Sequence, residues 1–134
     1  MNITLKWGFK HFHLIISLAI VIPTAIIYGS SSILPKFLNI QVNTNDFSNM
    51  LKAIMCLYLG ISLVWILGIF KPEYWKRATQ LSVLFMLTLA TGRVLSMVSD
   101  GLPTGGYVFG VIAELVIGLY SIYQLRRYKM EQLI

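Results

Sequence analysis

The sequence has few charged residues and a single cysteine, and each shortage excludes a class of protein. Charged residues are 12% of the chain, about half the usual share in a soluble domain, whereas 57% of residues are hydrophobic. A soluble fold of 134 residues leaves much of its surface wet and could not hide so much apolar surface. Cys56 alone cannot form an internal disulfide, and its place in an apolar run predicts a small buried hydrophobe. The composition indicates a membrane protein.

The sequence also lacks the motifs of common catalytic and metal sites. It contains no HExxH motif, no paired cysteines, no cluster of histidine with carboxylates and no glycine-rich phosphate loop. His11 and His13 are two positions apart, so on a helix they face different directions and would not share a metal ion. We therefore assign no catalytic residue, no metal site and no cofactor.

Four apolar runs dominate the chain, and each is near the ~20 residues that a helix needs to cross ~30 Å of hydrocarbon. Inside lipid a backbone must satisfy its own hydrogen bonds, and four strands would leave open edges there. The sequence thus predicts an all-α fold, an integral membrane four-helix bundle that forms a single domain over residues 1–134. The runs cover residues 12–34, 50–70, 78–99 and 102–125.

Basic residues predict how the helices are oriented. They gather before the first run, between the second and third runs, and after the fourth, whereas the other two connections hold one lysine between them. Since cytoplasmic loops carry the excess of lysine and arginine, we expect both termini in the cytoplasm and the chain in the cell membrane. The net charge of +6 is spread over short groups and not over one groove-sized face, which excludes nucleic-acid binding.

The region around the first connection carries two further expectations. A basic start, an apolar stretch and the small residues at positions 29–32 would also fit a cleaved signal peptide, although the apolar stretch is long for one. Residues 35–49 are too apolar for a solvated loop, so we expect a short segment lying in the membrane interface there.

Arg93 and Glu114 are the informative polar residues, because both lie within apolar runs where an unpaired charge is costly. The turn between the last two helices is so short that these helices must be adjacent and antiparallel. Counted from that turn at 1.5 Å per residue, Arg93 lies ~10 Å and Glu114 ~15 Å into the bundle, within reach of a long arginine side chain. We predict a charge-assisted contact between them.

Neighbouring residues extend this site. Gly106, Gly110 and Gly118 share a stripe with Glu114 and predict close helix packing. Ser96 and Asp100 share a face with Arg93, and Lys52 enters at the same end of the bundle on a face with Cys56 and Gly60. Tyr58 is included although it points about two-thirds of a turn away from Lys52. The candidate binding residues are Lys52, Tyr58, Arg93, Ser96, Asp100 and Glu114.

Two interpretations of this cluster stay open. In one, it is a polar pocket facing the outer leaflet that binds a lipid head group, a small anion or a proton, as intramembrane charges often do. In the other, it is a buried ion pair that fixes how the helices pack. A matched pair in a small-residue stripe slightly favours the structural interpretation.

The chain resembles a family of bacterial membrane proteins grouped as domain of unknown function 4345. The resemblance is carried by residues 52–60, by Gly92-Arg93-Val-Leu-Ser96, by Asp100-Gly101-Leu-Pro103 and by Glu114, and it extends from about residue 23 to 125. Lysine at position 52 and Met55-Cys56 depart from the arginine and glycine typical there. More distantly, the chain is similar to small four-helix bundles of the DoxX type. The resemblance implies the fold and a shared polar core, but no activity.

Three functions fit these features. The first is a non-catalytic accessory, assembly or lipid-binding component whose partners are membrane lipid and a protein partner or further copies of the chain. The second is a small oligomeric carrier or channel that uses Glu114. The third is a membrane enzyme acting on an isoprenoid or sterol-like lipid with Glu114 or Asp100 as general acid.

Overall fold

The computed structural model describes residues 3–131, and its elements there are all helices. Four of them are long and apolar enough to cross a membrane, which confirms the predicted all-α bundle and makes this a membrane protein. A fifth, short helix follows the first. The helices are α1 (Ile3–Gly29), α2 (Leu34–Leu38), α3 (Asn45–Phe70), α4 (Pro72–Asp100) and α5 (Gly105–Glu131).

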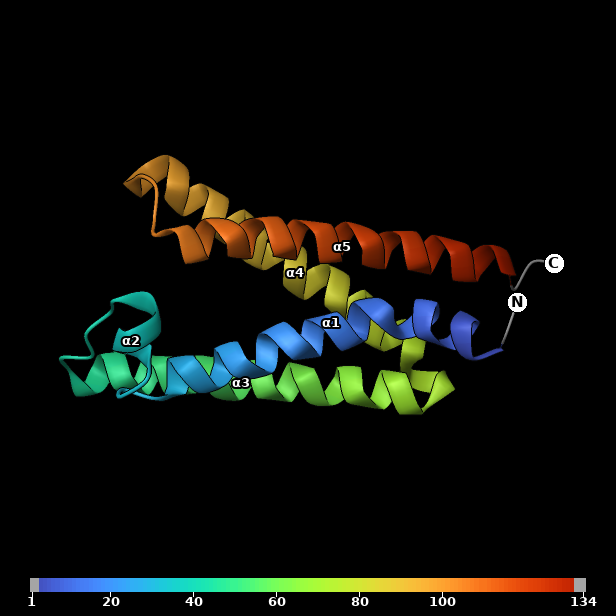
Figure 1. The fold of residues 1–134 in the computed structure, drawn as a ribbon, viewed down its shortest axis with the longest axis horizontal. Coiled ribbons are helices and arrows are strands. Elements are labelled where there is room, and N and C mark those ends of the chain that lie inside the picture. The colour runs from blue at the N-terminus through green and yellow to red at the C-terminus, as the bar shows by residue number, and fades with distance from the viewer. Residues whose placement is uncertain (1–2, 132–134) are drawn as a thin grey trace.

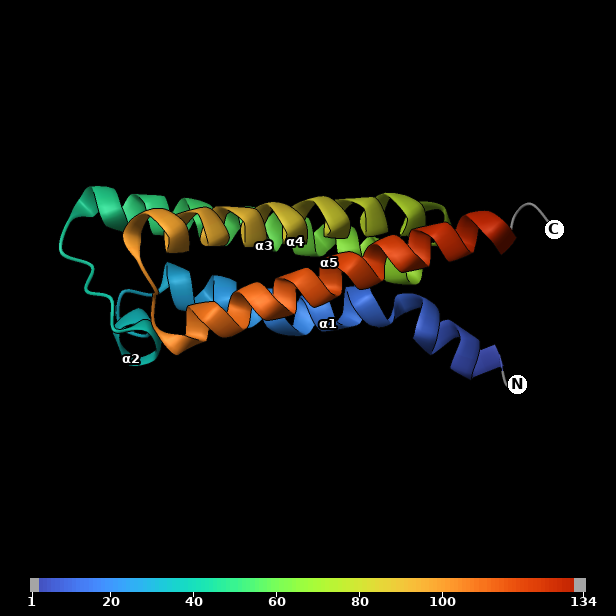
Figure 2. The ribbon, with the colours of Figure 1, turned by 90° about the horizontal axis from the view of Figure 1, so that it is seen from above.

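The four long helices pack as two antiparallel pairs, α1 with α3 and α4 with α5 (Figure 1). The start of α1, the end of α5 and the α3–α4 junction lie at one end of the bundle, which we call the terminal end. Helix α2 and the α4–α5 turn lie at the other, the α2 end (Figure 2). Helices α3 and α4 also pack together, but α1 and α5 make only sparse contact. The two pairs diverge toward the α2 end (Figure 1).

Local sequence signals explain where the helices begin and end. The Thr44 side chain accepts a hydrogen bond from the Phe47 backbone N–H at 3.1 Å and caps α3. Pro72 occupies the first turn of α4, where no backbone donor is needed, so one residue suffices to join α3 to α4. Gly101 ends α4 at φ 94°, a backbone conformation that side chains rarely allow. The resulting tight turn makes α4 and α5 adjacent, as predicted.

The apolar runs mark the helices but not their ends. Helix α1 stops at Gly29, so the prediction that the first run continues to residue 34 is wrong, and residues 34–38 form the separate helix α2. Helix α3 begins at Asn45, α4 begins at Pro72 and α5 continues to Glu131, each several residues beyond its apolar run. Polar residues at the membrane boundary extend a helix without lengthening its apolar run.

A buried polar layer joins three helices near the terminal end. His13 Nε2 lies 2.9 Å from Thr79 Oγ1, and both side chains are fully buried. Because the Thr79 hydroxyl donates to the Trp75 carbonyl at 2.8 Å, its oxygen accepts from His13, which places the imidazole proton on Nε2. Ser82 and Ser121 make a second link, 3.2 Å apart, between α4 and α5. These bonds satisfy polar groups that lipid could not.

Candidate functional site

The predicted contact between Arg93 and Glu114 is present. Arg93 Nε donates to both carboxylate oxygens of Glu114, at 3.0 Å to Oε1 and 3.2 Å to Oε2. The side chains are 19% and 11% exposed, so the ion pair is largely removed from the surroundings of the bundle. It joins α4 to α5, with Arg93 seven residues before the end of α4 and Glu114 nine residues after the start of α5. Each charge therefore has its partner inside the apolar span.

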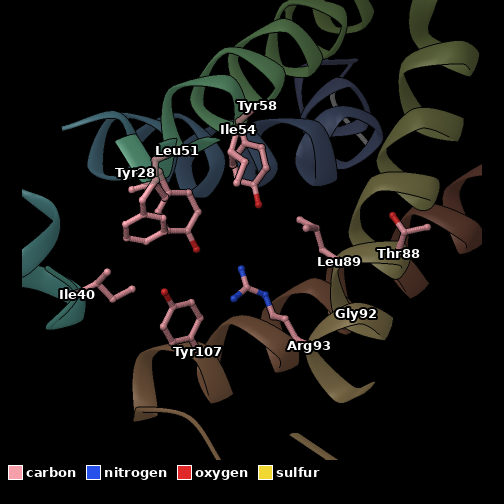
Figure 3. Close-up of a pocket in the computed structure, with 11 residues that line it drawn as sticks. Tyr28, Ile40, Leu51, Ile54, Tyr58, Thr88, Leu89, Gly92, Arg93 and Tyr107 are labelled. Atoms are coloured by element: carbon pink, nitrogen blue, oxygen red, sulfur yellow. The ribbon is translucent and has the colours of Figure 1, made fainter. Parts of the chain in front are cut away.

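Three tyrosines surround the free end of the guanidinium. The hydroxyl groups of Tyr28, Tyr58 and Tyr107 point toward its terminal nitrogens (Figure 3). The Tyr107 ring lies 5.2 Å from Arg93 Cζ in a cation–π contact, and the rings of Tyr28 and Tyr58 meet edge to face at 6.0 Å. The site thus gathers phenol groups from α1, α3 and α5 around an arginine of α4.

Two cavities reach this cluster, with volumes of about 390 and 300 Å³. The larger, shown in Figure 3, lies among the α2–α3 connection, α3 and α4. The smaller lies between α1 and α5, with Glu114 among its walls. Both are apolar apart from a few groups. The residues that line both are Tyr28, Tyr58, Leu89, Arg93 and Tyr107.

The smaller cavity opens sideways from the bundle. Its walls include Ile20, Phe37 and Phe109, which are 39%, 67% and 70% exposed. These apolar side chains would meet acyl chains in a membrane. The sparse contact between α1 and α5 provides this opening, and α2 contributes Phe37 and Leu38 to its edge.

The glycine stripe of α5 serves two purposes along its length. A Cβ on Gly118 would meet Leu87 Cδ2 at 2.6 Å, so α4 and α5 are closely packed there, as predicted. A Cβ on Gly110 would have nothing nearer than Arg93 Cζ at 3.9 Å, and one on Gly106 nothing nearer than Leu38 Cδ2 at 4.0 Å. Both of these glycines line the smaller cavity. Near the ion pair the small residues leave space and do not bring the helices closer.

The prediction that Lys52 joins the cluster is wrong. Lys52, Cys56 and Gly60 do share a face of α3, but all three are exposed, and none of them lines either cavity. Cys56 is accordingly not the buried hydrophobe expected from its apolar run. Tyr58, on the opposite side of the same helix, is 6% exposed and faces Arg93 (Figure 3). The helix is rotated so that its tyrosine, and not its lysine, points inward.

Ser96 and Asp100 lie apart from the ion pair. The Ser96 hydroxyl donates to Asp100 Oδ2 at 3.0 Å, and both residues are exposed near the end of α4. Neither lines the cavities, because α4 diverges from α3 toward the α2 end. Arg93, Ser96 and Asp100 do share a face of α4, but only Arg93 lies in the cluster.

Tyr28 and Tyr107 were missed by the sequence analysis as members of this site. Each lies near one end of its helix, a position typical of the aromatic residues at a membrane interface. No local pattern separates such a tyrosine from one that turns inward. Their meeting depends on how α1 and α5 are placed across the bundle, which no sequence motif predicts.

Comparison with known proteins identifies the family. The sequence model described as Domain of unknown function (DUF4345) matches residues 9–125, which cover most of each of the four apolar helices and every residue of the cluster. The chain belongs to the DUF4345 family. No curated protein and no solved structure matches it. The DUF4345 match thus confirms the resemblance.

The geometry of this DUF4345 protein limits what the cluster can do. Within the described residues no group of three histidine, cysteine or acidic side chains could hold a metal ion. The cluster instead offers the N–H groups of the guanidinium and three phenol hydroxyls, each of which can both donate and accept a hydrogen bond. An apolar cavity with a few convergent polar groups is the usual form of a small-molecule site.

Proposed function

We propose that this protein is a non-catalytic component of the cell membrane that binds one amphiphilic lipid in the cavity beside Arg93. The observation that carries the proposal is the sideways opening between α1 and α5, which leads from exposed apolar residues to a cluster of polar groups. A lipid would place its head among the tyrosines and leave its chain along Ile20 and Phe109.

The space at Gly110 favours binding over a purely structural ion pair. An ion pair that only fixed helix packing would be expected within closely packed side chains, as around Gly118. Here both cavities reach Arg93. The carrier and the enzyme stay predictions from the sequence, and no particular contact of the cluster favours either of them.

The cavity can be closed by a single substitution. Gly110→Leu would extend a side chain into the space beside Arg93, and we expect the amount of lipid retained by the purified protein to fall at least tenfold. Native mass spectrometry of protein released from nanodiscs measures this amount. Gly60→Leu is the matched control, because a Cβ at Gly60 meets nothing within 4 Å and Gly60 lines neither cavity. Equal retention by both variants would refute the proposal.

We also propose that both termini face the cytoplasm. The terminal end of the bundle carries Lys10, Lys71 and Arg126, whereas the α2 end carries Lys36, Lys52, Asp46 and Asp100. The positive-inside rule then places the terminal end in the cytoplasm and the lipid site in the outer leaflet. A reporter that is active only in the cytoplasm should be active when it is fused to the C-terminus. If only a reporter that works outside the cytoplasm is active there, the proposed orientation is wrong.

A further inference from the structure

The charges that line the two cavities sum to zero. Arg93 and Glu114 are the only charged residues among the lining side chains, and they are paired with each other. The nearby acidic residue Asp100 is exposed and bonded to Ser96, and Lys52 is exposed on the far face of α3. The arginine therefore carries no uncompensated charge that would attract an anion.

The cluster nevertheless presents donors to the cavity. Glu114 accepts only from Nε of the guanidinium, and Tyr28 hydrogen-bonds to both Arg93 and Tyr107. The other N–H groups of the guanidinium and the Tyr58 hydroxyl face the cavity (Figure 3). Donors directed into an apolar cavity need acceptor oxygens, because a polar group left unpaired there is costly. The ligand head must supply those oxygens.

An anionic head and a neutral head would satisfy these donors at very different cost. An anion would sit beside a complete ion pair and leave one uncompensated negative charge inside the apolar span. Its nearest fixed charge besides Arg93 would be the carboxylate of Glu114, which repels it. A carbonyl or hydroxyl oxygen accepts the same hydrogen bonds and adds no net charge.

We infer that the ligand is an electrically neutral amphiphile whose head offers carbonyl or hydroxyl oxygens, and that Glu114 determines this specificity by excluding anionic lipids. The inference rests on the proposed lipid site. Arg93 and the tyrosines bind the head, while Glu114 cancels the charge that would otherwise select phosphate. Removing the carboxylate should therefore change which lipid is bound, not merely how tightly.

Two lipids with identical chains test this directly. Dioleoylglycerol is neutral and presents ester carbonyls and a hydroxyl, whereas dioleoylphosphatidylglycerol carries a phosphodiester anion. We expect the wild-type protein to bind the first at least tenfold more tightly, as measured by native mass spectrometry of protein titrated with each lipid. A benzoquinone with a decyl tail, added in a separate titration, distinguishes ring carbonyls from ester carbonyls. Tighter binding of either neutral probe than of the anionic lipid supports the inference.

Variants of two carboxylates complete the test. Glu114→Gln should raise the affinity for dioleoylphosphatidylglycerol at least tenfold, because the site then carries one net positive charge. Asp100→Asn removes the same charge from the same end of the bundle but outside the cavities, and should leave both affinities unchanged. If Glu114→Gln is not recovered as a monodisperse protein, the preference of the wild-type protein between the neutral and the anionic lipid alone tests the inference.

The outcomes separate this inference from the proposed function. Tighter binding of the anionic lipid by the wild-type protein, or no gain in Glu114→Gln, would overturn the inference and leave the lipid site in place. If the wild-type protein binds neither the neutral probes nor the anionic lipid, both the inference and the proposed lipid site are wrong.

Discussion

Replacing either member of the Arg93–Glu114 pair with glutamine is expected to lower the free energy of unfolding by about 3 kcal/mol. Each single variant leaves one charge without its partner inside an apolar span, and the loss of one partner from a buried pair is costly. The double variant Arg93→Gln/Glu114→Gln leaves no charge and two amides that can bond to each other. It should therefore be more stable than either single variant.

The wild-type protein, the two single variants and the double variant are unfolded in mixed detergent micelles, and circular dichroism follows the transition. The free energy of unfolding of each variant is then compared with that of the wild-type protein. Ser96→Ala is the control, since it breaks an exposed hydrogen bond on the same face of α4 and should change stability by less than about 0.5 kcal/mol. Wild-type stability in both single variants would mean that the ion pair contributes nothing to the bundle. If the double variant loses as much stability as the two single variants together, the two residues do not interact.

The second large effect is expected at Gly68, where α3 meets α4 near their junction. A Cβ on Gly68 would overlap the Cβ of Ala78 and lie 3.6 Å from Trp75 Cα, and neither Cβ nor backbone can rotate away. Gly68→Ala should thus force the two helices apart and cost about 2 kcal/mol, as overpacking of a core does. The buried rings of Trp65 and Trp75 would lose contacts as the helices separate.

Gly60→Ala is the matched control for that substitution. It makes the same change in the same helix, two turns from Gly68, at a position where a Cβ meets nothing within 4 Å. Alanine also favours a helix over glycine, so this variant should be unchanged or slightly more stable. Thermal unfolding in one detergent compares the two variants, and equal midpoints would contradict the close packing of α3 on α4.

The sequence predicts the architecture because lipid leaves few alternatives. A run of about 20 apolar residues must be a helix if it crosses a bilayer. The short turn around Gly101 then forces α4 against α5, and the position of each charge along its helix predicts the Arg93–Glu114 contact. These inferences need only length, composition and distance from the turn.

The rotation of a helix about its own axis is harder to predict. A soluble helix shows its buried face by a stripe of apolar residues, but a membrane helix is apolar on every side. Lys52 was therefore placed inward by its charge, whereas α3 turns Tyr58 inward and leaves Lys52 exposed. A lysine near a helix end can extend its side chain to the membrane surface, which makes the exposed position inexpensive.

The cavity itself could not be predicted from the sequence, because it exists where α1 and α5 do not pack against each other. Glycines spaced by four residues indicate close packing, and Gly118 fulfils that expectation. At Gly110 the same spacing borders empty space, since α1 and α5 diverge toward the α2 end. The angle between two helix pairs is a property of the whole bundle and has no local signal.

A crystal structure of the protein grown in a lipidic mesophase tests the central claim most directly. We predict continuous electron density for a chain lying between α1 and α5, with its polar end within hydrogen-bond distance of Arg93 and the Tyr58 hydroxyl. Density for α1 packed against α5 along the full length of both helices, with the space at Gly110 filled by the protein's own side chains, would contradict it.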